Sequence, residues 1–570
     1  GRPDAVDARF ERMERSAHAR GLDVSSMHFA DDGAALRVGA AAAGGLAPGW
    51  MARAAASDGR DILAFGDARL FAPYAERGPA LARLADFAAS GGFETLHEGV
   101  SPIEGEAAVA VFDPARRRLA LARDAMGLLN VDHVDLTGGA AAFSTTPHEL
   151  LALEECSVDI DPDLSRWAAL GLSPPLGRGH WRDSRPLPAP QAAAFDRDVP
   201  AARLWGRAGP DPTAPTTREA ALERFGAELQ NAVKSRLQTE VGGPAVVFSG
   251  GLDSSMIAAV ASAASPGRSL GLYSMNSRDR MAHEDARIRR AATARLPGSR
   301  LIELQSGDLD PLEGAEASWV RFAAPNLDLL SVGTLSLARR MRSDGLSGAL
   351  HGLGGDFAVS AWTGPLFAEA LRSLNAAEAM RVYRALRRSA VSRRVLLRGW
   401  GLSAFGPTRW LARRIRSRLG PARPFRAPDD AENTRWRAQG LFGGRVFHPS
   451  MMAARMDGVG GAYRFRDARL PLGGAPGGGP VARMSYPLMD TRLISLALAT
   501  PTQLELHEGR DRGLARATLA SMGQAAAAGR GAKGPLAPGM WAKVGLALAS
   551  PPKCPSTASA RQGSAPPEIA

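Results

Sequence analysis

The sequence predicts an α/β protein with a β-rich domain followed by a domain built on a parallel sheet, and two observations support this fold class. Within residues 1–205, short segments of alternating apolar residues are separated by Gly, Pro and Asp, which are typical turn residues. From about Thr216, apolar segments of strand length instead alternate with segments of helical periodicity. Strands that alternate with helices are typical of a parallel, doubly wound sheet.

In the first domain we expect three strands, at residues 34–38, 107–113 and 119–124. Asp113-Pro114 lies between the last two and predicts a hairpin turn. Leu81, Leu84 and Phe87 recur at a spacing of three, which predicts a helix within residues 79–90. These elements suit either a β-sandwich or a layered α/β/β/α domain.

The second domain is expected to begin with an amphipathic helix. Thr216 and Glu219 form a capping-box pattern, and apolar residues then recur every three to four positions as far as Leu237. Beyond this helix we expect three more, at residues 254–260, 285–295 and 329–341. The strands are expected at residues 245–248, 269–273, 300–304 and 348–351.

Length and composition bound the class of protein. A chain of 570 residues with 45% hydrophobic residues predicts a folded protein of two or three domains, which we place at residues 1–205 and 216–550. The tail at residues 551–570 is rich in Pro, Ser and Ala and is expected to be disordered.

Cysteine use and hydropathy indicate the compartment. Cys156 and Cys554 are the only cysteines and have no CxxC spacing, so the sequence supports neither a disulfide framework nor a cysteine zinc site. The chain has no run of 18 apolar residues and does not begin with an apolar signal-like segment. We therefore expect a soluble, cytoplasmic protein.

The net charge of +12 is concentrated in one segment. Residues 381–426 hold 14 arginines and no acidic residue, so this Arg-rich insert carries more than the whole surplus. An arginine-rich helical insert would attract nucleic acid, an anionic membrane or an acidic peptide, and the simpler alternative is a solvated face.

Two glycine-rich segments follow predicted strands. Residues 249–255 read S-G-G-L-D-S-S, and residues 352–356 read G-L-G-G-D. The first lacks the lysine of a Walker A loop and the spacing of a Rossmann fingerprint. A tight loop between a strand and a helix gathers backbone N–H groups at a helix N-terminus and favours an anion such as phosphate. Both segments end parallel strands, so we expect them to meet at one site.

The string S-G-G-L-D-S-S resembles the pyrophosphate loop of the N-type ATP pyrophosphatases, which cleave ATP between the α and β phosphates. The resemblance implies ATP and Mg²⁺, with Asp253 and Asp356 as metal ligands, and carboxylate oxygens are ligands that a hard cation prefers. The nucleotide contacts that it implies are Val247, Ser249, Gly250, Gly251, Asp253, Ser254, Ser255, Met275, Gly352, Gly354 and Gly355.

The resemblance extends to most of the chain. Residues 105–127 look like the glutaminase-type, Ntn-hydrolase-like domain of asparagine synthetases, and the second domain is similar to their synthetase domain. The glutaminase reaction of that family requires an N-terminal cysteine, whereas this chain starts with Gly1 and has no cysteine before Cys156. We therefore expect the first domain to be an inactive glutaminase that serves as a scaffold or a peptide-binding surface.

Family members without that cysteine are mainly β-lactam-type synthetases and lasso peptide cyclases, which adenylate a carboxylate that an amine of the same molecule then attacks. The run R-G-A-K-G at residues 530–534, together with Arg512 and Arg516, resembles the closing R-x-x-K element of the family. Lys533 would then stabilise the amide-forming step.

Further roles come from the same resemblance. Residues 485–493 are similar to the segment beneath the acceptor pocket, so Tyr486 would either take the proton of the amine or pack in the core. Glu284 and Asp285 resemble an acidic pair after the second strand, with a helix cap as the alternative. Residues that would contact the substrate are Glu284, Asp285, Asp490 and Arg530.

The substrate class is predicted from the surface expected for the second domain. The Arg-rich insert, the glycine run at residues 473–479, Trp400 and Trp410 favour a broad basic surface for a peptide. We expect a lasso peptide cyclase that joins the N-terminal amine of a precursor peptide to an Asp or Glu side chain after a partner protease has removed the leader. The expected protein partners are this leader peptidase and a leader-recognition protein. The alternatives are a β-lactam-type synthetase, an ammonia-dependent asparagine synthetase, and an inactive peptide-binding scaffold; no nucleic-acid partner is expected.

Overall fold

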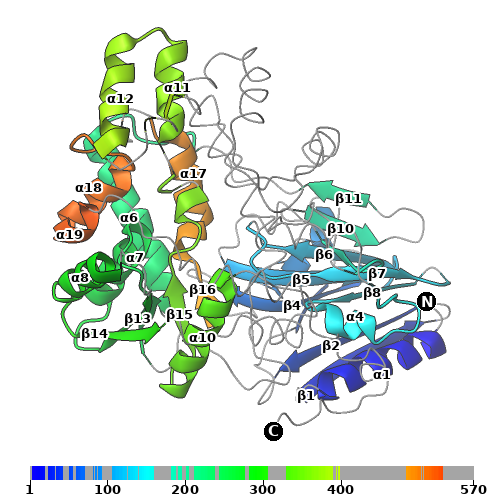
Figure 1. Ribbon diagram of the computed structural model, residues 1–570. Helices are drawn as coiled ribbons and strands as arrows, with labels where there is room; N and C mark the ends of the chain where they lie inside the picture. Colours follow the sequence, from blue (N-terminus) through cyan, green and yellow to red (C-terminus); the bar gives the residue numbers. More distant parts are fainter. Residues whose placement is uncertain are drawn as a thin grey trace.

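The protein is described by a computed structural model with two sheet-based parts (Figure 1). The described residues are 3–19, 23–31, 34–42, 51–55, 59–70, 81–82, 84–86, 88–92, 105–124, 126–138, 140–159, 181–187, 191–195, 201–204, 211–237, 243–276, 282–305, 329–357, 359–361, 363–388, 393, 396–397, 483–501, 504 and 506–529.

The first part is centred on an antiparallel six-stranded sheet with the order β11-β10-β6-β5-β4-β3. Its strands are β3 (Met51–Ala55), β4 (Asp61–Leu70), β5 (Gly105–Asp113), β6 (Arg118–Arg123), β10 (Gln191–Phe195) and β11 (Ala201–Leu204). Asp113 pairs with Arg118 at the end of the β5–β6 hairpin, which confirms the predicted turn. Arg117 closes this turn with a φ of 55°.

Smaller sheets and helices cover the six-stranded sheet. The sheets are β1 (Asp23–Asp31) with β2 (Ala34–Ala42), and β8 (Ala140–Ser144), β7 (Asp132–Leu136) and β9 (Arg185–Pro186) in the order β8-β7-β9. The helices are α1 (Pro3–Ala19) and α4 (Pro147–Leu151), and a π-helical turn, η1, spans Ala88–Gly92.

Three apolar clusters define the layers of this part. Leu81 and Leu84, from the predicted helix, pack on one face of the six-stranded sheet. On its other face lie Val38 of β2 and neighbouring side chains. A third cluster joins β7 and β8 to α4, with Met13 of α1 packed against it. The layers therefore run helix, sheet, sheet, helix, which is the layered arrangement among the two predicted for this part of the chain.

The second part contains a five-stranded parallel sheet with the order β14-β13-β12-β15-β16. Its strands are β12 (Ala245–Val247), β13 (Leu270–Asn276), β14 (Ser299–Gln305), β15 (Gly348–His351) and β16 (Arg483–Ser485). The four predicted strands and their parallel arrangement are confirmed. The fifth strand, β16, was not predicted from the sequence.

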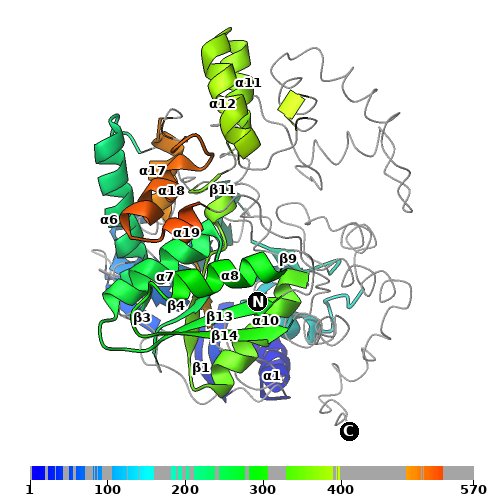
Figure 2. The ribbon, with the colours of Figure 1, turned by 60° about the vertical axis from the view of Figure 1, so that its left-hand side comes forward.

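Helices lie on both faces of the parallel sheet (Figure 2). Those along the sheet are α6 (Arg218–Leu237), α7 (Leu252–Ala264), α8 (Ala282–Thr293) and α10 (Leu329–Ser343). From β12 the chain passes through α7 to β13 and through α8 to β14, and α10 then brings it back across the sheet to β15. Because such crossovers are right-handed, α7 and α8 cover one face of the sheet and α10 covers the other. The direction reverses between β12 and β15, where open α/β sheets bind their ligands.

Later helices complete this part. They are α17 (Thr491–Ala499), α18 (Gly513–Ser521) and α19 (Ala525–Ala528), with the 3₁₀ turns η3 (Gly355–Phe357) and η5 (Pro487–Met489). Two further helices, α11 (Gly364–Arg372) and α12 (Ala376–Arg388), form a hairpin that projects from the sheet (Figure 1). No helix in the described ranges combines the length and apolar character needed to cross a bilayer.

The cap of α6 differs by one residue from the prediction. The hydroxyl of Thr217 accepts a hydrogen bond from the Ala220 N–H at 3.4 Å, so Thr217 is the capping residue and the predicted role of Thr216 was wrong. Two adjacent threonines precede the helix, and the sequence pattern does not distinguish them.

The two parts share an apolar core. Met126 and Leu128, in the turn after β6, belong to the same buried cluster as Phe225 of α6 and Phe248. The Asp124 carboxylate shapes that turn by accepting hydrogen bonds from the backbone N–H groups of Met126 and Leu128. The first part therefore supplies apolar side chains to the core of the second.

Candidate nucleotide site at the switch point of the parallel sheet

The segment after β12 forms a compact loop that leads into α7. Gly250 has a φ of 67°, a conformation that favours glycine. The Ser249 hydroxyl accepts a hydrogen bond from the Gly251 N–H at 3.3 Å, and the Ser254 hydroxyl accepts one from the Ser249 N–H at 3.2 Å. These bonds hold the loop around the N-terminus of α7, where the first N–H groups have no partner within the helix.

The segment after β15 lies directly against this loop. A Cβ atom on Gly352 would be 3.1 Å from the Ser254 backbone nitrogen, and one on Gly355 would be 2.9 Å from Asp253 Oδ2 and closer to its other carboxylate atoms. Gly354 has a φ of 100°, and a Cβ atom on it would collide with Met489. The structure thus confirms that the two loops meet, and it explains why glycines occupy these positions.

Asp253 and Asp356 are the acidic residues of the two loops. The Asp253 carboxylate accepts a hydrogen bond of 2.5 Å from the Ser360 hydroxyl. The Ser360 N–H donates to the Gly355 carbonyl at 2.8 Å, so Ser360 ties one loop to the other. Asp356 lies in η3 and forms an ion pair of 2.7 Å with Arg512 Nη1.

The Arg512 guanidinium is charged in this environment. Burial lowers its pKa, but Asp356, then Asp253 and Asp511, outweigh that effect, and the pKa stays above its ordinary value. The ion pair was missed by sequence reasoning, which associated Arg512 only with the closing R-x-x-K element.

The donor set fits Mg²⁺. This cation commonly binds through one or two carboxylates together with substrate phosphates, and Asp253 and Asp356 supply two carboxylates beside an N-terminal helix turn. Within the described ranges, no group of three or more His, Cys, Asp or Glu side chains gathers at this site or at any other, so a cation here would take its further ligands from the substrate phosphates and water. Asp253 and Asp356 would hold the cation, and their assignment as ligands stays a prediction.

The remaining predicted nucleotide contacts differ in how accessible they are. Val247 and Met275 are partly buried at the carboxyl ends of the neighbouring strands β12 and β13. Ser255 is 1% exposed and faces the core. Among the described residues, its hydroxyl has no hydrogen-bond partner. A direct contact between Ser255 and a nucleotide therefore needs a movement of α7.

Arg289 supports the loop from behind and was not predicted. A Cβ atom on Gly250 would be 2.9 Å from Arg289 Cγ. The buried Arg289 side chain donates to Glu303 at 2.9 Å and to Asn276 at 3.0 Å, and so links α8 to the ends of β14 and β13. No motif in the sequence identifies this residue, because it lies in a helix and its partners come from two separate strands.

Tyr486 lies in the core. Its side chain is wholly buried, and its ring is tilted against His351 with 5.7 Å between ring centroids. This position supports the alternative that the sequence left open, a packing role, over transfer of a proton from a substrate amine.

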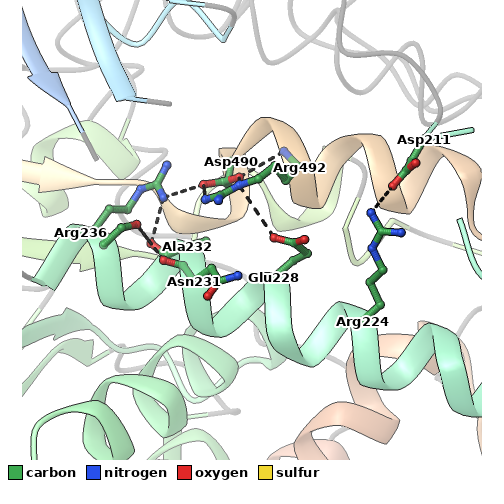
Figure 3. A network of polar contacts seen from close by, with 9 residues as sticks. Asp211, Arg224, Glu228, Asn231, Ala232, Arg236, Asp490 and Arg492 are labelled. Carbon is green, nitrogen blue, oxygen red and sulfur yellow. Dashed lines mark hydrogen bonds and ion pairs between the residues drawn. The ribbon is translucent and has the colours of Figure 1, made fainter. Parts of the chain in front are cut away.

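Asp490 has a structural position that differs from the predicted contact with substrate. Figure 3 shows its carboxylate between Arg236 and Arg492. The carboxylate lies 3.0 Å from a guanidinium nitrogen of each arginine, and the side chains of Arg236 and Asp490 are buried. It also caps α17 by accepting a hydrogen bond from the Arg492 N–H. Burial would raise the pKa of Asp490, but Arg236 and then Arg492 lower it below its ordinary value. The predicted role in substrate binding is not supported, because both oxygens face protein groups.

The other residues predicted from the sequence have the following positions. The backbone of Glu284 and Asp285 lies in the first turn of α8, inside the helix rather than at its cap. Arg516 is buried and holds Asp511 at 3.0 Å and the Ala528 carbonyl at 2.5 Å, which joins α18 to α19. Outside the described residues lie Lys533, Arg530, Trp400, Trp410, the glycine run at 473–479, most of the Arg-rich insert beyond Arg388 and the tail at 551–570.

Cys156 is unsuited to nucleophilic chemistry. It is buried, and burial followed by Asp183 raises the pKa of its thiol to about 11. This thiol stays protonated at neutral pH and does not replace the nucleophile of a glutaminase.

Comparisons with known proteins bear on the second part of the chain. Residues 224–451 match the family model described as asparagine synthase, which is less than half of the chain. No curated protein matches the sequence. A solved structure of glutamine phosphoribosylpyrophosphate amidotransferase from B. subtilis, complexed with ADP and GMP, is similar at 10% identity, with 52% of this chain and 62% of that chain covered. Its TM-score of 0.23 is too low to bear on the fold. The family match supports membership of the asparagine synthetase-like superfamily for the part of the chain that it covers.

Proposed function

We propose that the protein is an ATP-dependent, AMP-forming amide ligase, and specifically a cyclase that closes a macrolactam in a precursor peptide. The observation that carries the ligase activity is the contact between the two strand-end loops, which brings Asp253 beside Gly355 and Asp356 at the switch point of the sheet. The asparagine synthase match supports the same kind of activity.

The first step would activate a carboxylate. An Asp or Glu side-chain oxygen of the peptide attacks the α-phosphorus of ATP, the bond from that phosphorus to the bridging oxygen breaks, and pyrophosphate leaves. The N–H groups of the loop at residues 249–255 and the hydroxyls of Ser249 and Ser254 would hold the pyrophosphate. When bound, Mg²⁺ would neutralise charge on the phosphate oxygens. Ser360 donates a hydrogen bond to the Asp253 carboxylate and would help to orient it for this role.

The second step would form the amide. The N-terminal amine of the same peptide attacks the acyl carbon, the amine loses a proton, and AMP leaves with the electron pair of the C–O bond. Much of the advantage is positional, since effective molarities of held reactants reach about 10⁵ M or more. Lys533 would stabilise the charge of the tetrahedral intermediate.

The preference for a peptide over a small metabolite is supported by the described part of the Arg-rich insert. Helix α12 buries Val382 and Leu386 against α11 and exposes Met380, 48% of which is accessible. The same helix also exposes the arginines Arg381, Arg384, Arg387 and Arg388. A basic surface with apolar side chains suits an extended acidic peptide better than a metabolite. The partners would then be the leader-cleaved core peptide and the protease that prepares it.

The test is turnover with a defined peptide. Incubation of the full chain with ATP, Mg²⁺ and a synthetic core peptide should release AMP and pyrophosphate and yield a peptide lighter by one water. Turnover with free aspartate and ammonia would instead support an asparagine synthetase, and a small β-amino acid as substrate would support a β-lactam-type synthetase. Absence of pyrophosphate with every substrate would support a peptide-binding scaffold.

A further inference from the structure

Arg512 connects the C-terminal helices to the predicted metal ligands. Its Nη1 atom lies 2.7 Å from Asp356 Oδ1, and its side chain is 15% exposed, whereas that of Asp356 is 65% exposed. Asp356 directly follows Gly355, whose backbone touches the Asp253 carboxylate. The guanidinium therefore contacts one of the two carboxylates that a divalent cation would need, beside the loop that approaches the other.

The backbone holds Arg512 in an unusual conformation. Its φ and ψ are 56° and 46°, in the left-handed region that residues other than glycine rarely occupy. The next residue is Gly513, where a Cβ atom would be 2.5 Å from the Leu504 carbonyl oxygen and 2.6 Å from the Leu506 nitrogen. Close packing of this turn on Leu504 and Leu506 thus fixes the direction in which Arg512 leaves the chain. Such conformations persist where surrounding contacts determine them, often at functional positions.

A guanidinium and a divalent cation compete for one carboxylate. Arginine remains charged at all physiological pH values, and an oxygen that accepts its hydrogen bond is less available to a metal. Repulsion between the guanidinium and a cation a few ångströms away adds to this effect. Phosphate groups relieve it, because they offer the guanidinium another partner and add negative charge.

We propose that Arg512 is a resident counter-cation of the Asp253–Asp356 pair. Without nucleotide it occupies Asp356 and disfavours the binding of free divalent cation, so that the metal binds together with the phosphates. Arg512 is thus a positioning residue that couples metal binding to nucleotide binding. This role of Arg512 rests on the proposed function in one respect: Asp253 and Asp356 are taken as metal ligands.

The test measures metal affinity without turnover. Mn²⁺, whose free concentration is read by electron paramagnetic resonance, is titrated into the full chain without nucleotide. Arg512→Asn removes the charge, and asparagine tolerates the left-handed conformation. Arg381→Asn is the matched control, since it removes the same charge and an ion pair of 2.6 Å with Glu378 on α12.

The counter-cation role predicts that Arg512→Asn binds Mn²⁺ about tenfold more tightly than wild type, whereas Arg381→Asn does not. A purely structural ion pair predicts unchanged or weaker binding, and that result would overturn the proposal. Arg512→Lys keeps the charge and should stay close to wild type. Equal tightening in the Lys and Asn variants would also overturn it.

A second measurement covers the case in which the Asn variant does not fold. For the wild-type chain, Mn²⁺ should bind weakly alone and at least about tenfold more tightly with inorganic pyrophosphate, by reciprocal coupling. Equal affinity in both conditions would contradict the proposal. Asp356→Asn should remove Mn²⁺ binding; if it does not, the ligand assignment of the proposed function fails and the counter-cation role of Arg512 fails with it.

Discussion

Gly355 lies so close to Asp253 that a Cβ atom at this position would be 2.9 Å from one carboxylate oxygen and nearer still to the other. Both partners belong to the candidate site, and the clash involves a carboxylate that Ser360 holds in place. Gly355→Ala should therefore displace Asp253 and weaken ATP binding by about tenfold or more, as measured by calorimetry.

Gly226→Ala is the control for this change. Gly226 lies within α6, and a Cβ atom there would meet nothing within 4 Å. This variant should raise stability by about 1 kcal/mol through helix propensity and leave ATP affinity unchanged. Equal ATP affinity in the two variants would show that the contact between the loops is not needed for binding.

Ser360 offers a milder test of the same contact. Its hydroxyl donates to Asp253, and hydrogen bonds to charged groups contribute about 1.5–3 kcal/mol. Ser360→Ala should slow pyrophosphate release by about tenfold or more while the chain stays folded. Ser373→Ala, which removes a hydroxyl bonded to the Ala370 carbonyl on α11, should not change the rate. Full activity of Ser360→Ala would show that Ser360 does not contribute to the function of the site.

Much of the fold follows from local sequence patterns. The strands at Ala245–Val247, Leu270–Asn276 and Gly348–His351 each contain buried apolar residues, with turn-forming residues nearby in the sequence. Segments of this kind can be predicted as strands from sequence. Strand β16 spans only Arg483–Ser485 and exists through its pairing with β15, far away in the chain. A three-residue strand has too little periodicity to be predicted from sequence alone.

The candidate site, like the fold, was predictable only in its local parts. The loops at residues 249–255 and 352–356 were located from their glycines and from the strands before them. The pairs that tie them together were not, because Ser360 and Asp253 are 107 residues apart and no sequence spacing relates them. Asp490 shows how a distant contact can change the role predicted for a residue. Its segment resembles the one beneath an acceptor pocket, yet its ion pair with Arg236, 254 residues away in the chain, makes it part of the core.

That buried ion pair should control stability at low pH. The pKa of Asp490 is lowered in the folded state, so its ionised form stabilises the fold at neutral pH, and this contribution is lost as the pH falls through the folded-state pKa. Asp490→Asn leaves Arg236 buried without its counter-ion and should cost about 3–5 kcal/mol at pH 7, from urea unfolding.

The cost of Asp490→Asn should shrink on acidification below the ordinary range of an aspartate, since the wild-type carboxyl is then protonated too. Asp61→Asn, at an exposed pair with Arg53, is the control and should change stability little. A cost for Asp490→Asn that is small or independent of pH would contradict this role of Asp490.

The position of Tyr486 gives a negative prediction. Because the ring packs in the core against His351, Tyr486→Phe keeps the packing and should retain activity within about threefold, with a change in stability of about 1 kcal/mol. The rate of cyclised peptide formation measures this. A loss of this rate by several orders of magnitude would instead support a role of Tyr486 in proton transfer.

The most direct measurement follows pyrophosphate and peptide mass together in the wild type, Asp253→Ala and Lys533→Ala. The wild type should release one pyrophosphate for each peptide that loses one water. Asp253→Ala should release none, whereas Lys533→Ala should still activate the carboxylate and form little ring. Wild-type activity in both variants, or ring closure without pyrophosphate, would contradict an adenylating cyclase at this site.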